Sequence, residues 1–293
     1  MMTNLIKTGL GIVLVLSIAL IMEQCKNKDG SEDSEYKILF LHHSTGDVIY
    51  RGGSNARIIR GVRIGKEFDV PAWFKKYNKA QGTSYTITEQ NFPKGELYQW
   101  KNYPFDYYNI WVKHAGNNPY MGEPTLEMLT REYDLIVFKH CYPVCDINAD
   151  MANADIGSEE KTLANYKLQY EALKKKLKEF PDTKFILWTG AARVKSQMDT
   201  ATATRAGEFF NWVRNQWDTP GDNIFLWDFY ELETEGGLFL KDKYATGAND
   251  SHPVREFGAR AAPLFCQRIV DVIENNGENT TLTGKLLNRA GKE

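Results

Sequence analysis

From Tyr36 onward, short apolar runs alternate with longer segments in which apolar residues recur at helical spacing. The short runs are bounded by polar and turn-forming residues, which is typical of strands buried in a sheet. The longer segments carry apolar stripes, as helices do when they pack on a sheet. The pattern therefore predicts alternating strands and helices over most of the chain.

The short runs predict five strands, at residues 37–41, 84–89, 134–138, 184–188 and 223–227. The longer segments predict five helices, at residues 68–79, 124–132, 158–180, 204–217 and 253–274. Ser158 is expected to cap the third helix, because serine favours that position. Strands that alternate with helices form a parallel sheet covered on both faces. We therefore predict an α/β protein, a three-layer α/β/α sandwich around a five-stranded parallel sheet.

The first 35 residues differ from the rest of the chain. Lys7 precedes an uncharged apolar run from Gly9 to Met22, and a polar, acidic linker follows. This order is typical of a secretory signal segment, and the run is shorter than the about 20 residues of a membrane-spanning helix. We predict an exported protein, periplasmic or at the cell surface, which meets the membrane only through this segment. Lipidation of Cys25, an uncleaved anchor, and cleavage near Ala19 are the alternatives for its processing.

The remainder is predicted to form one domain over residues 36–275, followed by a polar tail over residues 276–293. The 42% hydrophobic content is enough for a sizeable core. The net charge of −2 gives no electrostatic reason to expect a nucleic acid partner. Four cysteines are too few for a disulfide scaffold. Cys141 and Cys145, beyond the third strand, are either a local disulfide or two free thiols.

The candidate chemistry lies beyond the carboxyl ends of the strands, where sites form in parallel sheets. Ser44 directly follows the first predicted strand. A serine hydroxyl is a weak nucleophile at neutral pH and therefore needs a base. His252, between the last strand and the last helix, is the best candidate. Either Asp250 or Asn249 is placed to hold its imidazole, and an acid there would stabilise the imidazolium.

A zinc site is the alternative use of some of these side chains, because imidazole and carboxylate groups bind zinc. It would involve His42, His43, His140 and Asp250. Their spacing matches no metal-binding motif, so we predict neither a metal nor another cofactor.

The placement of Ser44 and His252 resembles that in the SGNH (GDSL-like) hydrolases. His43-Ser44 stands where that family usually has Asp-Ser, and Asp250-Ser-His252-Pro253 resembles its terminal Asp-x-x-His-Pro motif. The resemblance covers residues 36–275. It implies a flavodoxin-like sheet of five parallel strands and the hydrolysis of esters, with Ser44 as nucleophile and His252 as base.

The terminal motif departs from the family pattern in the position of its acid. The usual acid stands three residues before the histidine, where this chain has Asn249. Asp250 stands only two residues before it. Some relatives that act on acetylated exopolysaccharide use this shorter spacing, so Asp250 is the predicted acid and Asn249 the alternative.

The oxyanion motifs also depart from the family pattern. The resemblance assigns an oxyanion glycine to the position of Gly95, with Gly116 as a rival. The family's Gly-x-Asn-Asp motif after the third strand is absent, and Phe138-Lys139-His140-Cys141 stands there. We therefore expect Lys139, His140 or a backbone N–H to take the place of the missing asparagine.

The predicted function is a serine esterase that removes acyl groups, most simply acetyl, from a carbohydrate. The alternatives are acyl transfer to a polysaccharide by the same residues, and a glycan-binding domain with a degenerate site. An aromatic cluster between the second and third strands would serve either as a sugar platform or as packing for a long loop. Its members are Tyr98, Trp100, Tyr103, Phe105, Tyr107, Tyr108 and Trp111.

Overall fold

A computed structural model describes residues 35–59, 62–150 and 153–279. The predicted signal segment, including Cys25, lies outside these residues, as does most of the predicted tail. Within the described part of the chain, no helix is long and apolar enough to cross a membrane.

Five parallel strands form the central sheet, in the spatial order β4-β1-β5-β6-β7. The strands are β1 (Tyr36–His42), β4 (Tyr85–Asn91), β5 (Leu135–Lys139), β6 (Lys184–Trp188) and β7 (Ile224–Trp227). Every residue of the central β5 is buried, which explains its unbroken apolar run. All five predicted strands are present within two residues of their expected bounds. Because β4 is the second strand of this sheet along the chain, the order is 2-1-3-4-5, the flavodoxin-like order.

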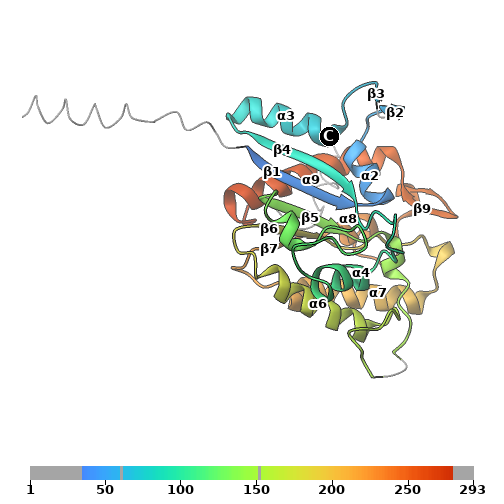
Figure 1. Ribbon diagram of the computed structural model, residues 1–293. Coiled ribbons are helices and arrows are strands. Elements are labelled where there is room, and N and C mark those ends of the chain that lie inside the picture. The colour runs from blue at the N-terminus through green and yellow to red at the C-terminus, as the bar shows by residue number, and fades with distance from the viewer. Residues whose placement is uncertain (1–34, 60–61, 151–152, 280–293) are drawn as a thin grey trace, which may run out of the picture. The chain divides into compact units, whose positions relative to one another are not determined.

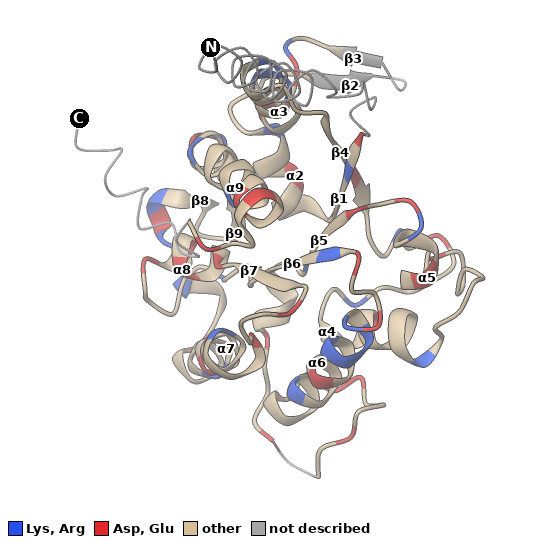
Figure 2. Ribbon diagram, turned by 90° about the vertical axis from the view of Figure 1, so that its left-hand side faces the viewer, with Lys and Arg blue, Asp and Glu red and all other residues tan. Residues whose placement is uncertain are grey.

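Helices cover both faces of the sheet (Figure 1). One layer consists of α2 (Ser44–Arg51), α3 (Asp69–Gln81) and α9 (Arg255–Asn275). The other consists of α4 (Pro104–Tyr107), α6 (Leu163–Leu177) and α7 (Thr200–Trp212). The predicted three-layer α/β/α sandwich is therefore confirmed. Lys, Arg, Asp and Glu lie mainly on the helices and loops of both layers, with the two signs interspersed (Figure 2).

Two helices begin elsewhere than the sequence pattern predicted. The predicted Ser158 cap is wrong, because α6 begins after Thr162, whose hydroxyl accepts from Asn165 N–H at 3.3 Å. Helix α7 begins four residues earlier than expected, after Asp199, whose carboxylate accepts from Thr202 N–H at 2.9 Å. In both cases the side chain that accepts an unpaired N–H of the first turn sets the start.

Several short elements escaped prediction because they contain too few residues to establish a period. They are α2, α8 (Phe229–Thr234), β2 (Arg57–Ile59), β3 (Val62–Ile64), β8 (Ala245–Gly247) and β9 (Asp250–Pro253). The predicted helix at 124–132 is reduced to α5 (Leu126–Leu129). The long loop predicted between the second and third strands contains α4 and a π-helix at Tyr108–Lys113. Two of these short elements, α2 and β9, carry the candidate nucleophile and base.

Candidate active site

Ser44 lies at a sharp turn from β1 into α2. It is the first residue of α2 and follows His43, whose extended backbone (φ −131°, ψ −160°) connects strand and helix. Gly46 makes this turn possible, since a Cβ there would lie 2.4 Å from the Cβ of His42. His42 is buried and its Nε2 lies 2.8 Å from Glu89 Oε2 on β4, which ties β1 to its neighbour. The turn thus exposes Ser44 at the carboxyl edge of the sheet.

His252 lies on β9, which pairs with β8 in a small antiparallel sheet. Its neighbour Ser251 is buried, and the Ser251 hydroxyl accepts from Val194 N–H at 3.1 Å in the loop after β6. Thr246 Oγ1 donates to the carbonyl of His252 at 2.9 Å. The backbone of this segment is therefore fixed from both sides. The imidazole of His252 is directed to Ser44.

Three side chains form a hydrogen-bonded chain at this edge. His252 Nε2 lies 2.8 Å from Ser44 Oγ, and His252 Nδ1 lies 2.6 Å from Asp250 Oδ1. An ionised carboxylate only accepts, so Nδ1 carries the proton and Nε2 accepts from the Ser44 hydroxyl. Asp250 Oδ1 also accepts from the backbone N–H of His252 at 3.0 Å. This backbone bond and then the imidazole bond lower the pKa of Asp250, so its charge is retained.

The alternative acid, Asn249, makes no such contact. Its backbone carbonyl accepts from Gln197 Nε2 at 2.7 Å, and its side chain is exposed. The shorter of the two spacings is thus the one that brings an acid to His252.

The other side of Ser44 differs from the expectation for an oxyanion site. Gly95 N–H, expected to be free, donates to Glu123 Oε1 at 3.1 Å. His140 is buried in the core between Tyr107 and Tyr170, at ring separations of 4.8 and 6.1 Å. These two assignments to the crevice need correction. The alternation of side chains along a strand explains the position of His140, because it points to the opposite face from Lys139.

Lys139 is also buried, with only 1% of its surface exposed. Its Nζ donates to Cys141 Sγ at 3.2 Å and lies 5.4 Å from the centre of the Trp188 ring. It therefore reaches the reacting hydroxyl only through Cys141, whose Sγ lies 3.9 Å from Ser44 Oγ. The rival glycine, Gly116, lies on a loop where its carbonyl accepts from Thr125 Oγ1.

Cys141 also lies at this site, although the sequence pattern raised it only as a candidate for a disulfide or a free thiol. Burial raises the pKa of its thiol, but the Lys139 ammonium and the N–H of Thr45 outweigh burial and lower it. The thiol is free, as is Cys145, which donates to the carbonyl of Ala191 at 3.2 Å. Of the two states considered for Cys141 and Cys145, the structure has two free thiols.

A polar network in the long aromatic loop holds Cys141 in place. The Cys141 N–H donates to Asn102 Oδ1 at 2.8 Å. The N–H of Asn102 donates in turn to the fully buried carboxylate of Asp106, which also accepts from Tyr98 Oη at 3.0 Å. Burial raises the pKa of Asp106 to about 6, although these bonds act against the rise. Asn102 and Asp106 thus position the site, a role with no signal in the one-dimensional pattern.

Most of the aromatic cluster packs the loop onto the sheet. The buried members are Tyr98, Tyr103, Phe105, Tyr107 and Trp111. Trp100 is the exception, because 43% of its surface is exposed. Its ring stacks on His43 at 4.3 Å and 18°, and lies against Gly95. An exposed aromatic face therefore lies beside the residue that precedes Ser44.

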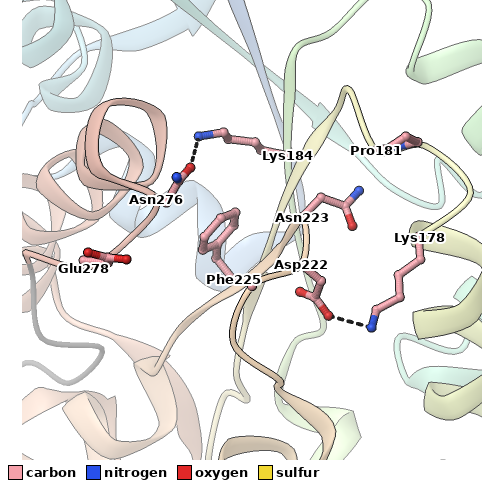
Figure 3. Close-up of a pocket in the computed structure, with 9 residues that line it drawn as sticks. Lys178, Pro181, Lys184, Asp222, Asn223, Phe225, Asn276 and Glu278 are labelled. Atoms are coloured by element: carbon pink, nitrogen blue, oxygen red, sulfur yellow. Dashed lines mark hydrogen bonds and ion pairs between the residues drawn. The ribbon is translucent and has the colours of Figure 1, made fainter.

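A pocket lies away from this site, at the amino ends of β6 and β7 (Figure 3). It measures about 590 Å³ and is lined by Lys184, Asn223 and Phe225 among others. Two of its charges form an ion pair, with Lys178 Nζ 2.8 Å from Asp222 Oδ2, and Lys184 Nζ donates to Asn276 Oδ1 at 2.9 Å. Among the described residues, no group of His, Cys, Asp and Glu is arranged to hold a metal ion.

Two solved structures resemble this chain weakly. One is a family two carbohydrate esterase from Cellvibrio japonicus, with 14% identity and a TM-score of 0.38 over 82% of this chain and 62% of that one. The other is a carbohydrate esterase whose active site displays divergent catalytic and non-catalytic binding functions. It has 13% identity and a TM-score of 0.33 over 80% of this chain and 68% of that one. This chain thus spans less than two thirds of the first structure. No protein-family model and no curated protein matches the sequence.

Proposed function

We propose that this protein is a serine ester hydrolase in which Ser44 is the nucleophile, His252 the general base and Asp250 the orienting acid. One observation carries the proposal: Ser44 Oγ, His252 and Asp250 form a continuous chain with bonds of 2.8 and 2.6 Å. Ser44 lies at the start of α2, whereas His252 and Asp250 lie on β9. Ser44 and His252 are 208 residues apart in the sequence. Nucleophile, base and orienting group within hydrogen-bond reach are the signature of an activated serine.

The reaction follows from the proton positions. Ser44 Oγ attacks the ester carbonyl while His252 Nε2 takes its proton, and the imidazolium then protonates the departing alcohol. Asp250 stabilises that imidazolium, because its low pKa keeps it charged. Water, activated by the same imidazole, then releases the acyl group from Ser44. Each step uses a group within reach of His252.

The carbonyl oxygen gains negative charge in this reaction and needs hydrogen-bond donors. The N–H of Ser44 is suited to this role, because the first N–H groups of a helix have no carbonyl partner within the helix. The N–H of the next residue, Thr45, is directed to Cys141. With Gly95 N–H also engaged, we propose an oxyanion site weaker than that of an efficient esterase.

The proposed substrate is an acylated carbohydrate, most simply an acetyl ester. Trp100 supports this class, since a half-exposed indole beside the nucleophile offers a flat apolar face to a sugar ring. The predicted export signal agrees with a substrate outside the cytoplasm, and we propose that location for the mature domain.

Replacement of the nucleophile is the decisive test of the hydrolase. Ser44→Ala should lower the turnover of a small acetyl ester by about 10⁴- to 10⁶-fold and abolish labelling by a fluorophosphonate. Ser54→Ala is the matched control, because Ser54 Oγ donates to a backbone carbonyl in a separate loop. Equal turnover by Ser44→Ala and the unmodified protein would refute the proposed chemistry.

The carbohydrate part of the proposal has its own test. Trp100→Ala should raise KM for an acetylated oligosaccharide by about 10-fold, corresponding to the loss of one stacking contact. Turnover of a small acetyl ester, which does not reach the indole, should change much less. A uniform effect on both substrates would show that Trp100 supports the fold and not a sugar.

A further inference from the structure

A buried cation and a thiol meet directly beneath Ser44. Lys139 and Cys141 are 1% and 2% exposed, and their Nζ and Sγ atoms are 3.2 Å apart. Cys141 Sγ also contacts Ser44 Oγ at 3.9 Å, and Ser44 is exposed. The sulfur therefore lies on the buried side of the Ser44 hydroxyl.

Neighbouring titratable groups leave Lys139 as the positive charge of this cluster. Burial and the nearby Lys139 lower the pKa of His43 to about 4, so its imidazole is neutral. Glu233 is fully buried, and burial raises the pKa of its carboxyl well above the usual range, which favours the uncharged form. The group that meets the ammonium at hydrogen-bond distance is the Cys141 sulfur, which favours the thiolate.

Cys145 provides an internal comparison. It is as buried as Cys141, but it donates to a backbone carbonyl, and burial raises its thiol pKa well above the usual range. A protonated thiol in apolar surroundings is inert, whereas a thiolate beside a cation reacts with electrophilic oxygen. Two cysteines four positions apart thus have thiol pKa values that are shifted in opposite directions.

We propose that Cys141 is a modification site at which a hydroperoxide oxidises the sulfur to a sulfenic acid and thereby reversibly blocks Ser44. The sulfur attacks the peroxide oxygen, the S–O bond forms, and the O–O bond breaks. The sulfur loses two electrons, and the departing hydroxide or alkoxide takes a proton to become water or an alcohol. In the reverse direction a reductant thiol attacks the sulfenic sulfur, releases water and forms a mixed disulfide. A second reductant thiol then breaks this disulfide, which regenerates the Cys141 thiol and leaves the reductant as its own disulfide.

The consequence for hydrolysis follows from the short distance to the nucleophile. At 3.9 Å, Ser44 Oγ and Cys141 Sγ are in contact, so an added oxygen must enter the crevice or displace the Ser44 hydroxyl. A sulfenate would also compete with the ester oxygen for the N–H groups at the start of α2. This blocking step rests on the proposed function of Ser44, whereas the oxidation itself does not.

The experiment compares the unmodified full-length protein with Cys141→Ser and with Cys145→Ser as the matched control. Each is exposed to hydrogen peroxide and then assayed for acetyl ester hydrolysis, fluorophosphonate labelling and oxygen addition by peptide mass. A sulfenic-acid reagent traps the product. Both cysteines and Met151 lie on one tryptic peptide, so an added oxygen there has three possible acceptors. The Cys145→Ser protein removes one of them, and the sulfenic-acid reagent, which does not react with a methionine sulfoxide, assigns the oxygen to Cys141.

The unmodified protein and Cys145→Ser should lose at least about 10-fold in activity and labelling, and a thiol should restore both. Cys141→Ser should keep the activity that it has before treatment. The proposal is overturned if Cys141 gains no oxygen, if Cys141→Ser is inactivated equally, or if oxidised Cys141 leaves labelling of Ser44 unchanged. Should the untreated protein hydrolyse no ester, the mass measurement still decides whether Cys141 is oxidised, so the two failures are distinguishable.

Discussion

The residues on the two sides of Ser44 differ in how exposed they are and in what they bond to. On the base side, Asp250 and His252 lie on one short strand, with side chains 45% and 29% exposed, and every hydrogen bond favours proton transfer. On the oxyanion side, Lys139 and Cys141 are buried and bonded to each other. The proposed proton relay therefore depends on local chain geometry near the surface, whereas buried residues set the charge environment of the proposed nucleophile.

Because of this difference, the two sides should tolerate amino-acid substitutions differently. An exposed carboxylate is solvated in either protonation state, so substitution there should alter the chemistry and leave the fold intact. A buried ammonium depends on its partner, because an unpaired charge in the core is costly. Changes on the base side should therefore appear as lost turnover, and changes on the oxyanion side as altered reactivity and stability.

The largest effect is expected at the base. His252→Asn should lower kcat by about 10⁴- to 10⁶-fold, since the serine would lose its proton acceptor. The free energy of unfolding should change little, because the imidazole is partly exposed. Ester hydrolysis and thermal unfolding measured on the same preparation check both parts. A fall in kcat below about 10-fold would assign the base role to another group.

The next effect distinguishes the two candidate acids. Asp250→Asn should lower kcat by about 10²- to 10⁴-fold, because the amide cannot stabilise the imidazolium. Asn249→Ala is the neighbouring control and should remain close to unmodified activity, since Asn249 accepts a hydrogen bond through its backbone carbonyl, which the substitution keeps. The reverse ranking in steady-state kinetics would contradict the assignment of Asp250.

The same contrast explains how much of the molecule could be predicted from its sequence. The five strands were found because each is an apolar run with turn residues at its ends. The closeness of Ser44 and His252 could be expected because strand ends in a parallel sheet converge on one edge. Asp250 was favoured over Asn249 by resemblance alone, and the geometry has the same preference.

The oxyanion side could not be predicted in the same way. Cys141 is held by Asn102 and Lys139, and Gly95 by Glu123, so its geometry depends on contacts between distant segments. No local period encodes such contacts. Lys139 and His140 also look equivalent in the sequence, although one points toward Cys141 and the other into the core. The two residues differ in the direction in which their side chains leave the end of β5.

A moderate effect is expected from Lys139→Met, which removes the buried charge and keeps an unbranched side chain. The lowered pKa of the Cys141 thiol should rise, since Lys139 is its main charged neighbour. Alkylation of Cys141 at neutral pH should become about 10-fold slower, while kcat should fall by less than the about 10²- to 10³-fold typical of a lost oxyanion donor. A loss in that larger range would mean that Lys139 acts on the substrate directly. Lys178→Met, in the remote cavity, is the control.

The smallest effect concerns the pH dependence of stability on the oxyanion side. Burial lowers the pKa of His43 from its usual 6.5 to about 4, so between these values the unfolded chain binds more protons than the folded one. The contribution of His43 is therefore complete above about pH 6.5 and is lost as the pH falls toward 4. The full shift would correspond to about 3 kcal/mol. The imidazole is partly exposed and screened by solvent, so His43→Asn should remove only about 1 kcal/mol of this pH dependence, measured by urea unfolding across the window. The carboxyl of Asp106, whose pKa is raised from 3.8 to about 6, contributes to the pH dependence of stability with the opposite sign in the same range. The variant must therefore be compared with the unmodified protein at each pH.

If stability depends on pH with the same slope in both proteins, the uncharged state of His43 is contradicted. In that case the imidazole would add a positive charge beside Lys139.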